Sequence, residues 1–113
     1  MYLCFDILTG MERDSFLESI TKAIRGKDPA AEAFLFGSRA RGDNRPDSDW
    51  DILILTDYPV DLNKEREFRN HLYDLELETG EPFSLFAYSN KDWETKQKVT
   101  PFYVSVSKEG IRL

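Results

Sequence analysis

The chain has 113 residues, enough for one domain with one hydrophobic core and too few for a separate substrate domain. Its 15 Lys and Arg against 21 Asp and Glu give a formal net charge of −6, which argues against binding along duplex DNA, because nonspecific affinity for DNA depends on Lys and Arg. One cysteine allows no internal disulfide, and one cysteine with one histidine argues against a zinc site. We therefore expect one domain over residues 1–113 in a reducing, cytoplasmic compartment.

The N-terminal segment, residues 1–10, is apolar but far shorter than a membrane-spanning helix, and it contains Asp6. We expect an added edge strand or a tail there, and no membrane association. Thr9 begins a sequence with the spacing of a capping box, which predicts a helix that ends near Gly26. The apolar residues of this helix recur on one face, at Phe16, Leu17, Ile20 and Ile24.

A short apolar run at residues 33–36 predicts a buried strand, because it is too short for a core helix. Gly37 follows it, and a residue without a Cβ lets the backbone turn sharply and lets a phosphate approach the main chain closely. Ser38 adds a hydroxyl and an N–H group at the start of a short helix, where anions bind. Arg39 and Arg41 supply guanidinium groups suited to phosphate oxygens. This stretch therefore predicts a phosphate-binding loop.

Turn-forming residues at positions 43–48 predict a chain reversal before a strand over residues 51–56. Side chains alternate along extended backbone, so Asp49 and Asp51 share one face and Trp50 takes the other. Two carboxylates separated by about 6.5 Å of strand can converge on one divalent ion or bracket a pair of them. Oxygen ligands of this kind favour Mg²⁺ or Mn²⁺ over zinc.

The rest of the chain alternates between helix and strand patterns. Either Asp61 or Asn63 caps a long helix, which Gly80 ends. Residues 82–89 then predict a third strand. Helices alternating with strands predict an α/β or α+β domain built on a sheet of about three to five strands. Two short helices are predicted near the C-terminus, with caps at Ser89 and Thr100.

Residues 37–42 (GSRARG), the polar linker after them and residues 48–51 (SDWD) resemble the signature of the polymerase-beta-like nucleotidyltransferase superfamily, G-S-x-A-x-G followed by a spacer and D-x-D. The chain is similar to the minimal nucleotidyltransferase (MNT) group over about residues 12–113, including its closing segments at 100–103 and 108–111. The resemblance implies a mixed sheet flanked by helices. It also implies transfer of a nucleoside monophosphate from ATP or another nucleoside triphosphate, with Mg²⁺, and release of pyrophosphate.

The chain departs from the superfamily pattern at one position. Members usually carry a third carboxylate on the next core strand, where it orients or deprotonates the attacking hydroxyl. The equivalent position by register is Ser84, and a serine is a poor base. Glu81 is the remaining candidate for this carboxylate, although Pro82 after it also fits a turn or helix end.

Two functional classes follow from these residues and the resemblance. In the first, the protein is an enzyme in which Asp49 and Asp51 hold the metal, the glycine loop binds the triphosphate, and Arg41 with Arg39 balances developing charge. In the second, it binds a nucleotide or a partner without efficient transfer. The resemblance implies a helical HEPN protein as partner, with this chain as an antitoxin that modifies or masks it. The acceptor hydroxyl and the oligomeric state stay open.

Overall fold

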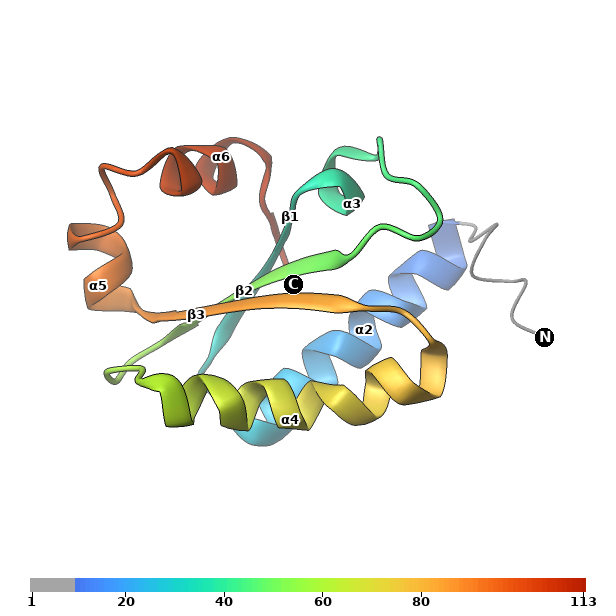
Figure 1. Ribbon diagram of the computed structural model, residues 1–113, viewed down its shortest axis with the longest axis horizontal. Helices are drawn as coiled ribbons and strands as arrows, with labels where there is room; N and C mark the ends of the chain where they lie inside the picture. The colour runs from blue at the N-terminus through green and yellow to red at the C-terminus, as the bar shows by residue number, and fades with distance from the viewer. Residues whose placement is uncertain (1–9) are drawn as a thin grey trace.

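The computed structural model describes residues 10–113 (Figure 1). The expected N-terminal strand or tail and the cap at Thr9 lie outside these residues. The first helix, α2 (Gly10–Lys27), ends one residue past the predicted Gly26. Its apolar residues Phe16, Ile20 and Ile24 are buried, as their spacing predicts. Within residues 10–113, no helix is both long enough and apolar enough to cross a membrane.

Four strands form one mixed sheet in the order β3-β2-β1-β4. They are β1 (Glu32–Phe36), β2 (Trp50–Thr56), β3 (Phe83–Ser89) and β4 (Ile111–Arg112). β1 is antiparallel to β2 and β4, whereas β2 is parallel to β3. Parallel neighbours need a crossover connection, and α4 (Leu62–Thr79) provides it. The mixed sheet flanked by helices confirms the expected α+β fold class.

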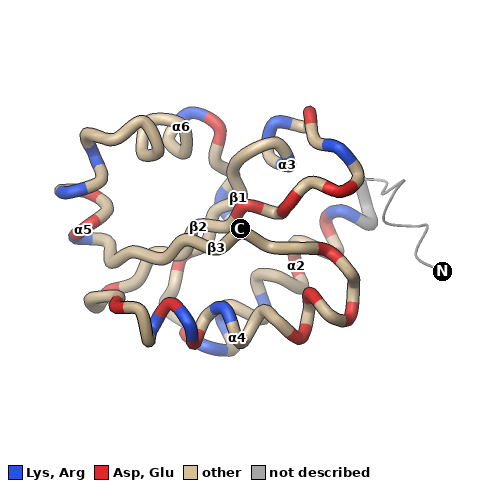
Figure 2. Tube along the Cα trace, viewed as in Figure 1, with Lys and Arg blue, Asp and Glu red and all other residues tan. Residues whose placement is uncertain are grey.

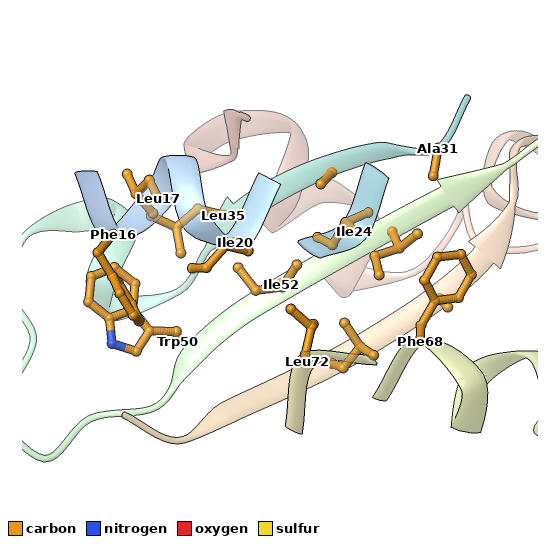
Figure 3. Packing of buried hydrophobic residues seen from close by; sticks show 14 residues of the cluster. Phe16, Leu17, Ile20, Ile24, Ala31, Leu35, Trp50, Ile52, Phe68 and Leu72 are labelled. Carbon is orange, nitrogen blue, oxygen red and sulfur yellow. The ribbon is translucent and has the colours of Figure 1, made fainter. Parts of the chain in front are cut away.

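The sheet carries hydrophobic residues on both faces. α2 and α4 lie together under one face, and their apolar residues pack against Leu35 and Ile52 (Figures 1 and 3). On the other face, α5 (Asn90–Thr95) and α6 (Pro101–Glu109) cover a second core. β2 is therefore buried on both faces, which explains why its residues 52–55 are all apolar. The second core consists of Phe36, Leu53, Leu55, Trp93 and Val106.

The helix ends follow the predicted capping residues. Asp61, not Asn63, caps α4, because its side chain accepts a hydrogen bond from the backbone N–H of Lys64. Gly80 ends that helix in a left-handed conformation, with φ 76°. Acidic and basic residues alternate over the first half of α4, and the second half carries acidic residues, so the helix has a charged outer face (Figure 2). The two short helices are capped as predicted by Ser89 and Thr100.

Candidate active site

A sharp turn joins β1 to the short helix α3 (Ser38–Arg41). Gly37 makes this turn with φ 77° and ψ −160°, a combination that is essentially restricted to glycine. The Gly37 carbonyl accepts hydrogen bonds from the N–H groups of Ala40 and Arg41, both at 3.0 Å. Gly42 closes the turn with φ 86°. The strand, glycine turn and helix thus have the arrangement that the sequence predicts.

Gly37 lies directly against the carboxylate of Asp51. A Cβ built on Gly37 would stand 2.1 Å from Asp51 Oδ2, far inside any non-bonded contact. Asp51 is in register with Phe36 on one neighbouring strand and with Ser84 on the other. The glycine turn and the first residues of β2 therefore form one continuous surface.

Asp49 and Asp51 lie close together at the start of β2. The Ser84 hydroxyl, beside Asp51 in the sheet, donates a hydrogen bond of 2.9 Å to Asp49 Oδ2. Trp50 points the other way, into the core, where its ring lies 4.7 Å from that of Phe16 (Figure 3). The alternation predicted for these residues is therefore present, with the two carboxylates on the side opposite the indole.

The two carboxylates repel each other in this arrangement. Burial raises the pKa of Asp51 above its usual value, the negative charge of Asp49 raises it further, and Arg41 opposes both effects. A carboxylate in this position is stabilised by a cation. The groups that could bind a metal ion here are the carboxylates of Asp49 and Asp51 and the hydroxyl of Ser84. All of them offer oxygen atoms, which fit Mg²⁺ or Mn²⁺. Within residues 10–113, no group of three Asp, Glu, His or Cys residues is arranged to hold a metal ion.

Asp51→Asn should stabilise the metal-free protein at neutral pH. Because the pKa of Asp51 is raised on folding, its contribution to the free energy of unfolding becomes unfavourable as the pH rises through the ordinary and then the raised value. We expect a higher melting temperature for Asp51→Asn at pH 7 in EDTA, and a difference that shrinks at acidic pH. Asp74→Asn, an exposed site on α4, is the matched control. A lower melting temperature at pH 7 would contradict this account.

Arg41 lies at the edge of the site and is exposed. Its guanidinium pairs with Asp43 at 3.0 Å and with Glu109, at the end of α6, at 3.1 Å. Hydrogen bonds to these two carboxylates raise the pKa of Arg41. The contact with Glu109 spans 68 residues, and no local sequence signal indicates it. The loop between α3 and β2 carries charges of both signs (Figure 2).

Arg39 and Glu81 occupy a different place from the other predicted site residues. Both side chains are buried, and they pair with each other at 3.5 Å. Glu81 Oε1 also accepts a hydrogen bond of 2.8 Å from Nε1 of Trp50. The structure therefore gathers Gly37, Ser38, Asp49 and Asp51 with Ser84, and places Arg41 at their edge. It puts Arg39 and Glu81 beside the indole, without a hydrogen bond to Asp49 or Asp51.

The mixed sheet, with its glycine turn against Asp51, agrees with the arrangement that the resemblance to nucleotidyltransferases implies. The family model described as "Polymerase beta, Nucleotidyltransferase" matches residues 18–102. The chain belongs to this family.

Three solved structures illustrate the shared fold. A toxin–antitoxin crystal structure with AMP-PNP matches at TM-score 0.61 and 20% identity, over 84% of this chain and 69% of the other. A putative nucleotidyltransferase matches at TM-score 0.58 and 23% identity, over 86% and 96%. A tri-AMPylated Shewanella oneidensis HEPN toxin in complex with MNT antitoxin matches at TM-score 0.55 and 16% identity, over 88% and 70%. Comparison with curated proteins gave no match.

Proposed function

We propose that this protein is a Mg²⁺-dependent nucleotidyltransferase that transfers AMP from ATP to a hydroxyl acceptor. The observation that carries the proposal is the direct contact between the Gly37 backbone and the Asp51 carboxylate, next to Asp49. Because of this contact, the backbone at Gly37, which a phosphate can approach closely, lies beside two carboxylates that could bind a metal ion. In the reaction, the acceptor oxygen bonds to the α-phosphorus, the bond to the bridging oxygen breaks, pyrophosphate leaves, and the acceptor proton passes to solvent.

Each residue of the site has a distinct role in this proposal. Asp49 and Asp51 would hold the metal ion, and Gly37 with Ser38 would bind the triphosphate. A bound Mg²⁺ would supply electrostatic stabilisation of the charge that develops on the phosphate oxygens. Arg41 is exposed, and within residues 10–113 its guanidinium pairs with Asp43 and Glu109, so it is free to exchange Glu109 for a phosphate oxygen.

The likeness to toxin–antitoxin structures supports a specific acceptor. One of those structures contains AMP-PNP, and another contains an AMPylated HEPN toxin with an MNT antitoxin. We propose that the acceptor is a hydroxyl of a HEPN-type helical protein and that this chain acts as the antitoxin. A protein tyrosine or serine is the class of acceptor that fits a modified protein partner.

One observation favours a second function, in which the chain binds its nucleotide or partner without efficient transfer. The position beside Asp51 on β3 is occupied by Ser84, and the described residues contain no group of three Asp, Glu, His or Cys side chains placed to hold a metal ion. A serine hydroxyl provides no general base, so the attack of the acceptor would be slow. In that case the protein would neutralise its partner by masking it.

Converting both Asp49 and Asp51 to Asn should abolish the Mg²⁺ dependence of ATP binding, because neutral amides are poor ligands for this ion. Calorimetric titration of ATP with Mg²⁺ and with EDTA measures the effect. The double variant Asp14→Asn with Asp74→Asn is the matched control, since it removes the same charge from two exposed helix positions. Unchanged Mg²⁺-linked affinity in the site variant would show that the aspartates do not hold the metal.

Transfer is measured separately from binding. With α-labelled ATP, Mg²⁺ and an extract of the host, the wild-type chain should label a protein that is unlabelled in the same extract without the chain. With γ-labelled ATP the chain should add no such label, because the γ-phosphate leaves in pyrophosphate. Mg²⁺-linked binding without any labelled protein would favour the binding module over the enzyme.

A further inference from the structure

We propose that Arg39 is a positioning residue that acts with Glu81 to fix the chain on both sides of Asp49, and so sets the metal affinity of the site. This inference rests on the proposed function, in which Asp49 holds a metal ion with the triphosphate. In this role Arg39 does not contact the substrate, although it belongs to the glycine-loop motif.

The guanidinium of Arg39 is directed at the segment that leads into Asp49. Its Nη2 donates to the carbonyl oxygens of Pro46 and Ser48, both at 3.0 Å, and its Nε donates to the Ser48 carbonyl at 3.3 Å. Ser48 is the residue immediately before Asp49. Only 5% of Arg39 is exposed. The side chain of Arg39 therefore binds the backbone of the segment between α3 and β2.

The same guanidinium holds the residue that follows Asp49. It lies 4.5 Å from the centre of the Trp50 ring, a cation–π distance. Glu81 links the two side chains, since its Oε1 accepts from Trp50 Nε1 and pairs with Arg39 Nη2. Glu81 is itself buried, and a buried carboxylate needs such partners to offset its desolvation. Asp49 is thus flanked by two residues that one guanidinium fixes.

The orientation of Asp49 depends on these neighbouring contacts because its own side chain makes few contacts. Its side chain is exposed, and within residues 10–113 its carboxylate accepts a single hydrogen bond, from Ser84. The position of its carboxylate is therefore determined by the backbone between Ser48 and Trp50. Groups that orient metal ligands without touching the metal change metal affinity by about 10–100-fold when they are lost. A lysine cannot replace Arg39, because one ammonium lacks the planar fork that reaches two carbonyls and stacks on an indole.

Arg39→Lys tests the proposal through metal affinity. We expect the affinity of the ATP complex for Mg²⁺ to fall about 10–100-fold, with recovery at high Mg²⁺ and with ATP affinity in EDTA unchanged. Calorimetry gives both affinities, and Mn²⁺ binding followed by electron paramagnetic resonance gives a spectroscopic measure of the same site. Arg66→Lys, at an exposed position on α4, is the matched control and should change neither quantity.

Two results would overturn the inference. An equal loss of ATP affinity in EDTA would show that Arg39 contacts the triphosphate. Unchanged Mg²⁺ affinity, with only a lower melting temperature, would show that Arg39 contributes to stability alone. A wild-type chain without Mg²⁺-linked binding would instead refute the proposed function and this inference with it.

Glu81→Gln provides the second variant, and it carries the test if Arg39→Lys does not fold. Glutamine keeps an oxygen that accepts from Trp50 Nε1 but removes the charge that pairs with Arg39. We expect a fall in Mg²⁺ affinity in the same direction as for Arg39→Lys. A loss of transfer at unchanged Mg²⁺ affinity would instead identify Glu81 as the third carboxylate and overturn its assignment as a positioning residue.

Discussion

Gly37→Ala is expected to abolish Mg²⁺-linked ATP binding and to lower the stability of the protein. An alanine in this backbone conformation costs about 1–3 kcal/mol, because its φ and ψ are essentially restricted to glycine. The added Cβ would also stand 2.1 Å from Asp51 Oδ2, so the carboxylate must leave its position. Calorimetric titration of ATP with and without Mg²⁺ measures the first effect, and thermal unfolding measures the second.

Gly80→Ala separates the loss of the site from simple backbone strain. Gly80 has nearly the same φ as Gly37, 76° against 77°, but a Cβ built there meets no described atom within 4 Å outside the adjoining residues. Gly80→Ala should therefore lower the melting temperature and leave nucleotide binding intact. If Gly37→Ala retains Mg²⁺-linked affinity, the contact between the glycine turn and Asp51 has no part in binding.

Ser84→Asp is expected to raise the rate of transfer. The side chain at this position already lies beside Asp51 and reaches Asp49, so an aspartate there would place a carboxylate where it can act as a general base. General-base assistance typically contributes about 10²–10⁴-fold to a rate. Labelling of the acceptor with α-labelled ATP, at saturating Mg²⁺, would show even a partial gain.

Two further variants control for size and for charge. Ser84→Asn has nearly the same shape as Ser84→Asp without a basic group, so it should not raise the rate. Ser15→Asp adds the same charge at an exposed position on α2 and should change nothing. Equal transfer by the wild type and Ser84→Asp would mean that hydroxyl activation does not limit the reaction.

The parts of the site that are local in sequence were predictable from sequence. The strand before Gly37, the turn, and the opposite orientations of Trp50 and Asp51 all follow from patterns a few residues long. The helix cap at Ser89 was predictable for the same reason, since its side chain bonds a backbone group three residues away. Short-range geometry determines each of these features, so the residues on either side contain the information.

The parts that depend on distant residues were not predictable in this way. β4 is two residues long and exists because Phe34 and Leu35 offer it a free edge, so it has no periodicity of its own to detect. The pairing of Arg39 with Glu81 spans 42 residues and depends on the packing of the indole between them. A buried arginine and an exposed one look the same in a motif, and only the fold distinguishes Arg39 from Arg41.

The residues proposed to bind the nucleotide and the position proposed to activate the acceptor lie on different segments of the chain. The residues proposed to bind the triphosphate and metal lie within one antiparallel hairpin, formed by β1 and β2. The position that would activate the acceptor lies on β3, beyond the α4 crossover. A substitution on β3 can therefore alter the chemistry toward the acceptor while the hairpin keeps its nucleotide. In this architecture, the acceptor-activating position can change without replacing any residue proposed to bind the nucleotide, and an inactive member can arise without losing its ligand.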